Sequence, residues 1–79
     1  MTEYKVVVTE KSTKWFNLKD QLHREDGPAV ENVNGKFYYI NGEKHRENGP
    51  AIEYADGDKF YYINDRYLSE TEFNDITNP

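Results

Sequence analysis

The sequence predicts a mainly β fold, in which tandem hairpin repeats form an antiparallel meander of about six strands and a short C-terminal helix follows. Two observations predict the repeats. The stretch HREDGPA at residues 23–29 returns as HRENGPA at residues 45–51, and each copy is followed by β-prone residues that alternate around a turn sequence. A third observation, a capping pattern at residues 69–72, predicts the helix.

The chain of 79 residues is predicted to be a single domain of three units. Residues 1–22 form a degenerate first hairpin repeat, residues 23–43 the second repeat, residues 44–67 the third, and residues 69–77 the helix. In the first unit, KWFNLKDQLHRE aligns with KFYYINGEKHRE of the second. This alignment gives Trp15 the place of Phe37 and Phe16 that of Tyr38, and EYKVVVTE supplies the strand before them.

Short sequence patterns predict the turn of each hairpin. In the second repeat, Asn34-Gly35 stands between AVENV and KFYYI, and this dipeptide is favoured in two-residue type I′ turns. In the third repeat, ADGD at residues 55–58 is longer and suits a type I turn closed by a glycine bulge. The resulting register predicts one sheet face made of Trp15, Val30, Phe37, Tyr39, Ile52, Tyr54, Phe60 and Tyr62.

The C-terminal segment LSETEF contains a capping box. Ser69 is the N-cap and Glu72 stands at the third helical position, so the helix is expected to run to about Thr77. Leu68 and Phe73 can lie on one stripe of it. We expect this helix to cover one sheet face or the last edge strand.

The repeated HRE-x-GPA motif is interpreted as the connection between hairpins. Its glycine (Gly27 or Gly49) supplies a positive φ and its proline starts a strand. The arginine is expected to pair with a nearby carboxylate while the histidine packs over the turn. A zinc site shared by both copies is the rival interpretation. It is disfavoured, because the chain has two histidines and no cysteine, and equivalent positions lie about 9.5 Å apart in a flat sheet.

Composition narrows the class of protein. The absence of cysteine excludes disulfides and fits a reducing compartment, and no apolar run or basic N-terminal stretch indicates a membrane span or a signal peptide. The formal net charge is −5, which argues against direct binding of nucleic acid. The charge is uneven, because residues 47–79 hold two basic and eight acidic residues, a net charge of −6.

No catalytic or cofactor-binding constellation stands out. Glu31 and Glu53 can share a sheet face, but a repeat produces matched carboxylates without chemistry. The only serines are Ser12 and the helix cap Ser69, so no nucleophile with a base and an orienting group can be assembled. The Asp56-x-Asp58 pattern lacks the later ligands of a calcium loop. The sequence therefore predicts a non-enzymatic protein without cofactor or metal.

The stretches HREDGPAV, NGKFYYINGEKHRENGPAIEYADG and FYYINDRYLSETEF resemble the short hairpin repeat, loosely related to MORN repeats, of many small phage and bacterial proteins. The resemblance covers roughly residues 14–76. It implies a phage or mobile-element accessory protein in the cytoplasm of a host bacterium, often an inhibitor of a CRISPR complex or another defence enzyme. It carries no family-wide catalytic residue.

The leading hypothesis is thus an acidic, anti-CRISPR-like binding protein that blocks a host nucleic-acid-handling protein by protein-protein contact. Acidic side chains steer basic partners and tyrosines anchor interfaces. The predicted partner-binding residues are Glu53, Tyr54, Asp56, Asp58, Tyr61 and Asp65. The alternatives are a structural module that self-associates as a homodimer, and a repeat-type antitoxin. No membrane contact is expected.

Overall fold

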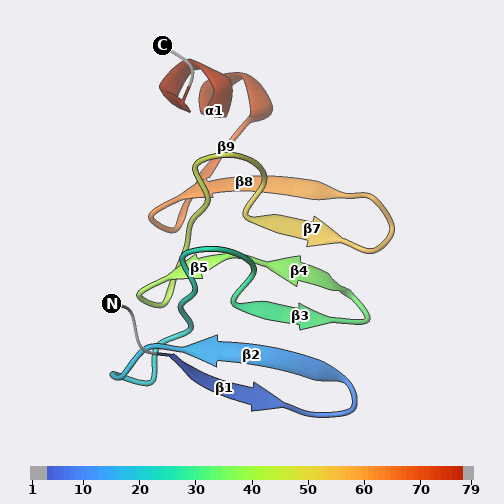
Figure 1. Cartoon of the computed structure of the whole chain (residues 1–79). Coiled ribbons are helices and arrows are strands. Elements are labelled where there is room, and N and C mark those ends of the chain that lie inside the picture. The colour runs from blue at the N-terminus through green and yellow to red at the C-terminus, as the bar shows by residue number, and fades with distance from the viewer. Residues whose placement is uncertain (1–3, 78–79) are drawn as a thin grey trace.

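The computed structural model describes residues 4–77 and confirms the mainly β fold with one C-terminal helix. Seven strands form an antiparallel sheet in the order β1-β2-β3-β4-β7-β8-β9, while β5 pairs with β6 (Figure 1). The elements are β1 (Lys5–Val8), β2 (Ser12–Phe16), β3 (Val30–Asn32), β4 (Gly35–Phe37), β5 (Tyr39–Ile40), β6 (Glu43–Lys44), β7 (Ile52–Tyr54), β8 (Lys59–Ile63), β9 (Arg66–Leu68) and α1 (Glu70–Thr77).

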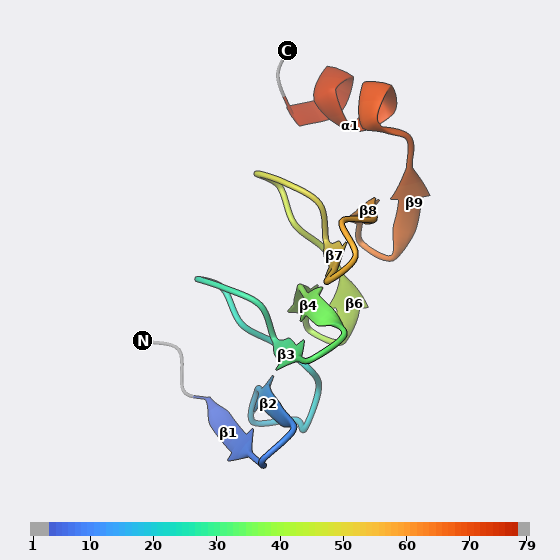
Figure 2. The same ribbon diagram turned by 90° about the vertical axis from the view of Figure 1, so that its right-hand side faces the viewer.

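The molecule is a thin, single-layered stack of hairpins. It measures 35 × 31 × 17 Å, and the units follow one another from β1 to α1 in both views (Figures 1 and 2). One layer leaves few side chains enclosed. The buried apolar residues in the described part are Ala29, Val30, Ala51, Ile52, Leu68 and Phe73, so stability depends on contacts between neighbouring repeats.

A second set of hairpins, which the sequence analysis did not predict, raises the strand number above six. Asn41 and Gly42, with φ of 49° and 82°, join β5 to β6, and Asn64 and Asp65, with φ of 49° and 68°, join β8 to β9. Positive φ at both central residues is what a type I′ turn requires. These turns point to the side opposite the β3–β4 and β7–β8 turns (Figure 1). The chain therefore turns back alternately at one side of the molecule and at the other.

The predicted type I′ turn at Asn34-Gly35 is wrong. Asn32 pairs with Gly35, so the turn consists of Val33 and Asn34, and the Asn32 side-chain oxygen accepts the N–H of Asn34 at 2.8 Å. Gly35 begins β4 with φ of 153°, and a Cβ there would lie 2.2 Å from the carbonyl oxygen of Glu53. Glycine is therefore needed for the close approach of β7.

The longer turn of the third repeat agrees with the prediction. The N–H of Gly57 donates to the carbonyl of Tyr54 at 3.0 Å, and Gly57 has φ of 101°. The N–H of Tyr54 donates in turn to the carbonyl of Asp58 at 2.9 Å. The glycine at positive φ closes the turn, as a glycine bulge does.

The predicted face of Trp15 is also wrong. Lys14, and not Trp15, stands opposite Val30 in the sheet, so Trp15 points to the other face. Trp15 corresponds to Tyr38, because their N–H groups donate to Ala29 and Ala51, both at 2.7 Å. The stretch from Trp15 to His23 is one residue longer than that from Tyr38 to His45, because of the turn of residues 17–21, and this extra residue shifts the alignment by one position.

The two sheet faces have different chemistry. One carries the apolar row Val30, Phe37, Ile52 and Phe60. The other carries, at the next positions, the alternating charged row Glu31, Lys36, Glu53 and Lys59. Opposite charges on neighbouring strands favour this register over a shift by one residue.

Helix α1 begins as predicted. The Ser69 hydroxyl accepts the N–H of Glu72 at 3.1 Å and the Glu72 carboxylate accepts the N–H of Ser69 at 3.0 Å. The backbone N–H of Ser69 and its hydroxyl, helped by Arg66, hold the pKa of Glu72 below its ordinary value. Phe73 packs on Tyr61, with ring centroids 4.7 Å apart, so the helix lies on the sheet face that carries the charged row.

Within residues 4–77, no helix has the length and apolar character needed to cross a membrane.

Candidate functional site

Each HRE-x-GPA copy holds two repeats together through its backbone. The N–H of His23 donates to Trp15 in the preceding repeat at 2.9 Å, and the N–H of Arg24 donates to Tyr39 in the repeat that the motif begins at 3.1 Å. The second copy repeats this change of partner one unit later, with distances of 3.1 and 3.2 Å. The motif is therefore the point at which the chain passes from one repeat to the next.

The arginine of each copy folds back over an aromatic ring. The Arg24 guanidinium lies 4.0 Å from the centroid of Trp15, and that of Arg46 lies 3.9 Å from the centroid of Tyr38. A Cβ on Gly27 would lie 2.9 Å from the Arg24 guanidinium carbon. Neither motif glycine has a positive φ, so the predicted conformational reason for them is wrong. Glycine at these positions leaves room for the arginine to fold back over the ring.

Hydrogen bonds fix the Arg46 guanidinium in this position. Its Nε–H donates to the side chain of Asn48 at 3.2 Å, and Nη1–H donates to the Pro50 carbonyl at 3.1 Å and the Glu53 carboxylate at 2.6 Å. Arg24 makes the corresponding bond to Asp26 at 3.0 Å. Aspartate and asparagine alternate in the motif because both offer the same acceptor oxygen.

The histidine of each copy holds the turn of the next hairpin. His23 Nδ1 accepts the N–H of Asn41 at 2.8 Å, and His45 Nδ1 accepts the N–H of Asn64 at 3.1 Å. Both asparagines are the first residues of the type I′ turns. An accepting Nδ1 carries no proton, so the histidine proton is on Nε2. This contact leaves the ring a structural role and removes Nδ1 as a metal ligand.

The end of the third repeat shows what the motif does, because no third copy of the motif stands after Tyr61. Leu68 pairs with Tyr61 and takes the place of the histidine, and α1 follows it within the described residues where a hairpin follows each motif copy. Phe73 covers the Tyr61 ring, as Arg24 covers Trp15 and Arg46 covers Tyr38 in the earlier repeats. Helix α1 therefore terminates the array in the manner of a capping repeat.

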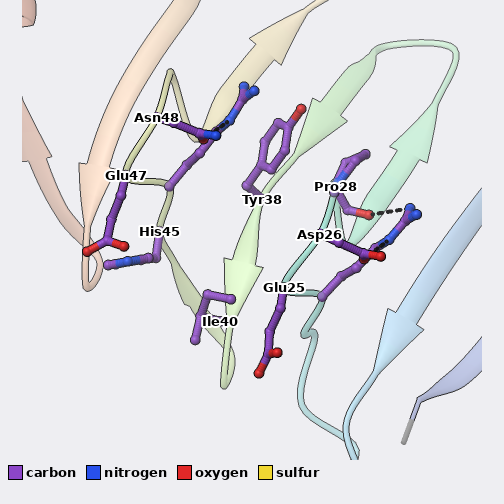
Figure 3. Close-up of a pocket in the computed structure, with 11 residues that line it drawn as sticks. Glu25, Asp26, Pro28, Tyr38, Ile40, His45, Glu47 and Asn48 are labelled. Atoms are coloured by element: carbon purple, nitrogen blue, oxygen red, sulfur yellow. Dashed lines mark hydrogen bonds and ion pairs between the residues drawn. The ribbon is translucent and has the colours of Figure 1, made fainter. Parts of the chain in front are cut away.

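A groove lies between the two motif copies. One copy forms each wall, and Tyr38 and Ile40 lie between them (Figure 3). The groove has a volume of about 740 Å³. The carboxylates of Glu25 and Glu47 point toward the same end of it (Figure 3), but the arginines that line the walls are held by the motif's own contacts.

A continuous set of aromatic rings, which we name the aromatic face, lies on the opposite side of the sheet. Tyr54 meets Phe37 and Phe60 edge to face, with centroid distances of 5.7 and 5.8 Å. Tyr67 extends the set, at 6.3 Å from Phe60 and 5.6 Å from Tyr62. Tyr54 is 39% exposed and Tyr67 is 59% exposed. Because α1 packs on the other face, these rings remain at the surface.

Acidic side chains border the aromatic face at the β7–β8 turn. Tyr54, Asp56 and Phe37 line one shallow hollow together with Val33. Asp58 follows in the same turn, and its N–H donates to the Asp56 carboxylate at 3.0 Å. We name Asp56 and Asp58 the acidic tip, because both are exposed at the end of the hairpin.

The structure brings together three of the six predicted partner-binding residues, namely Tyr54, Asp56 and Asp58. The other three have structural contacts elsewhere. Glu53 points to the opposite face and accepts from Arg46, and Tyr61 lies against Phe73. Asp65 is in the β8–β9 turn, where its carboxylate accepts the N–H of Lys44 at 2.9 Å. The three that cluster are the stronger candidates for a binding site.

Sequence reasoning missed Tyr67 as a member of the aromatic face, although it placed Phe60 on the same face as Phe37 and Tyr54. The signal was available in RYLSE, where Tyr67 stands two positions after Asp65 of an Asn-Asp turn. Pairing across that turn places Tyr67 opposite Tyr62. The missed hairpin thus concealed the most exposed ring of the face.

The described residues do not assemble a metal site. Within residues 4–77, no three or more His, Asp or Glu side chains are grouped so that they could hold a metal ion. The Glu53 carboxylate is used by Arg46, which removes it from a pair with Glu31.

Comparisons of the chain with protein-family models, with curated proteins and with solved structures found no match.

Proposed function

We propose that this protein is a non-enzymatic binding protein that occupies a basic surface of a host nucleic-acid-handling protein and blocks it. The observation that carries the proposal is the aromatic face with the acidic tip at its border. Aromatic rings exposed together anchor protein interfaces, and the acidic tip adds attraction for lysine and arginine.

The chemistry of such a partner follows from the charge. Surfaces that bind nucleic acid are rich in lysine and arginine, because they must neutralise phosphates. The acidic tip beside the aromatic face competes for the same cations. The net charge of −6 in residues 47–79 speeds the encounter with a basic surface and makes the rate sensitive to salt.

The scaffold keeps this surface in a fixed arrangement before binding. Phe37, Tyr54 and Phe60 belong to neighbouring strands, and each ring rests on the next. Because the rings are already ordered, binding costs less side-chain entropy than it would for free tyrosines. The motif copies on the other face maintain the spacing of the strands.

Affinity capture from bacterial lysate with the tagged protein tests this proposal. The Asp56→Asn/Asp58→Asn variant removes both charges of the acidic tip, and asparagine retains an acceptor for the turn. The control, Glu10→Gln/Asp75→Asn, removes the same charge at exposed positions of another hairpin tip and of the helix.

A nucleic-acid-handling protein held by the wild type and the control supports the proposal. The acidic-tip variant should then associate about three- to tenfold more slowly at low salt, with the difference lost at high salt. Equal rates for the two variants would contradict the site, and the absence of any such partner would contradict the function.

A further inference from the structure

Strand β1 ends the sheet on the side away from α1. It pairs with β2, and within residues 4–77 no strand pairs with its outer edge. All four of its residues are exposed, with Val6 42%, Val7 41% and Val8 70% accessible. It contains no proline, and no bulge interrupts its pairing with β2. Natural sheets protect an edge with such features, with short strands or with charged side chains, and β1 has only its short length and Lys5 at its start.

The pairing of β1 determines which backbone groups point outward. The N–H of Thr9 donates to Ser12 at 2.8 Å, so alternate residues, Val7 and Lys5, also bond to β2. Val6 is opposite Trp15, whose N–H and carbonyl are bonded to Ala29 and His23 instead. The N–H and carbonyl groups of Val6 and Val8 therefore face the open edge.

We propose that this edge is a self-association surface, on which a second copy of the chain pairs antiparallel about a two-fold axis at Val7. In this register Val6 and Val8 of each copy form hydrogen-bonded pairs with Val8 and Val6 of the other. Val7 meets its own counterpart in the pair between them. All four outward backbone groups of each strand are then satisfied.

The side chains fit a second copy of the same strand. The register brings three valines of each copy together, and β-branched pairs stabilise neighbouring strands. This register places Lys5 opposite Thr9. A two-fold axis moved two residues toward the N-terminus, to Lys5, would instead bring the two Lys5 side chains close to each other. Lys5 is also drawn to Asp20, with Nζ and Oδ1 3.2 Å apart.

Pairing of two copies through β1 determines on which side their aromatic faces lie. Val7 shares its sheet face with Lys14 and Val30, and this is the side of the aromatic face. A two-fold axis perpendicular to the sheet leaves both aromatic faces on the same side. The dimer is a bivalent form of the protein, and because the paired strands are short it is expected to be weak and concentration-dependent.

Single cysteines test the register, because the natural chain has none. Non-hydrogen-bonded antiparallel pairs have Cα atoms about 4.5 Å apart, which suits a disulfide. Val7→Cys should therefore form an oxidised dimer at least about tenfold faster than Val6→Cys or Val8→Cys. Val33→Cys, at a hairpin tip that is 77% exposed, measures the rate of random collision.

Proline substitution provides the second test. Val8→Pro removes an N–H that faces outward, so the monomer should fold with unchanged circular dichroism while its mass no longer rises with concentration in sedimentation. Val7→Pro removes an N–H bonded to β2 and should damage the fold itself.

The proposal is overturned if Val7→Cys crosslinks no faster than Val33→Cys, or if Val6→Cys or Val8→Cys is the fastest. A wild-type mass that stays monomeric up to about millimolar concentration would also overturn it. These experiments use the isolated protein, so their outcome does not depend on the proposed partner.

Discussion

Replacing Arg46 by methionine tests whether the repeated motif is a structural joint. The substitution keeps an unbranched apolar stem and removes the guanidinium. That group lies over Tyr38 and donates to Asn48, Pro50 and Glu53. Its side chain is 22% exposed and that of Glu53 is 32% exposed, so solvent weakens these contacts only in part.

The expected loss of unfolding free energy is about 2–4 kcal/mol. A partly exposed cation–π contact contributes about 0.5–1 kcal/mol, and a hydrogen bond to a charged group contributes about 1.5 kcal/mol or more. A chain of this size has a total stability of about 4–12 kcal/mol. Arg24→Met should cost less, about 1–2 kcal/mol, because its carboxylate partner is 76% exposed and its bond to the Pro28 carbonyl is longer, at 3.5 Å.

Chemical denaturation followed by far-ultraviolet circular dichroism measures both losses. Arg46→Lys should resemble Arg46→Met, because lysine keeps the charge but not the planar group that stacks and donates in two directions. A loss below about 0.5 kcal/mol for Arg46→Met, or full rescue by lysine, would show that the Arg46 guanidinium does not hold the repeats together.

The remaining predictions concern the turns and the cap. Gly35→Ala should lower the unfolding free energy by more than about 3 kcal/mol, since its Cβ would strike the backbone of β7. Gly57→Ala has open space around its Cβ and should cost only the strain of a positive φ, about 1–2 kcal/mol. Thermal unfolding compares the two variants. The pKa of Glu72 is lowered in the fold, so its carboxylate stabilises the folded protein at pH values above the ordinary pKa of 4.5. This stabilisation is lost as the pH falls through the lower pKa of the folded state. Glu72→Gln should therefore lack this part of the acid-induced loss in a pH series of melting curves. Phe73→Ala should cost about 2–4 kcal/mol and increase hydrogen exchange in β8 and β9 first, whereas uniform exchange along the sheet would contradict its role as a cap.

Much of the fold could be predicted because its signals are local. The duplicated motif predicted the repeat, the alternating residues predicted the strands, and Ser69 with Glu72 predicted the start of the helix. Each of these depends on neighbours in the sequence, and the structure agrees on the hairpin order, on the glycine turn at Gly57 and on the capping box.

The errors arose where contacts between repeats decide the outcome. Strands of two residues, such as β5 and β6, are too short for a period-two pattern, so the Asn41-Gly42 turn was overlooked. Gly35 resembles a turn glycine, but β7, which lies beside it only in the folded chain, determines its role. Gly27 likewise depends on how Arg24 folds back, which side-chain torsions decide.

The candidate site was predictable in part for the same reason. The acidic turn and Tyr54 stood out in the sequence because composition and turn signals identify exposed hairpin tips. Tyr61 and Glu53 looked equally available, and only the packing of Phe73 and Arg46 against them gives them structural roles.

The most direct measurement compares two variants of opposite faces in the same affinity capture, with bound proteins quantified by mass spectrometry. Tyr67→Ser alters the most exposed ring of the aromatic face, and Glu25→Gln/Glu47→Gln alters the groove between the motif copies. If the motif is scaffold and the aromatic face binds, partner retention falls at least about fivefold for Tyr67→Ser and remains near wild type for the groove variant. The reverse result, loss with the groove variant and retention with Tyr67→Ser, would make the repeated motif the binding element and contradict the account.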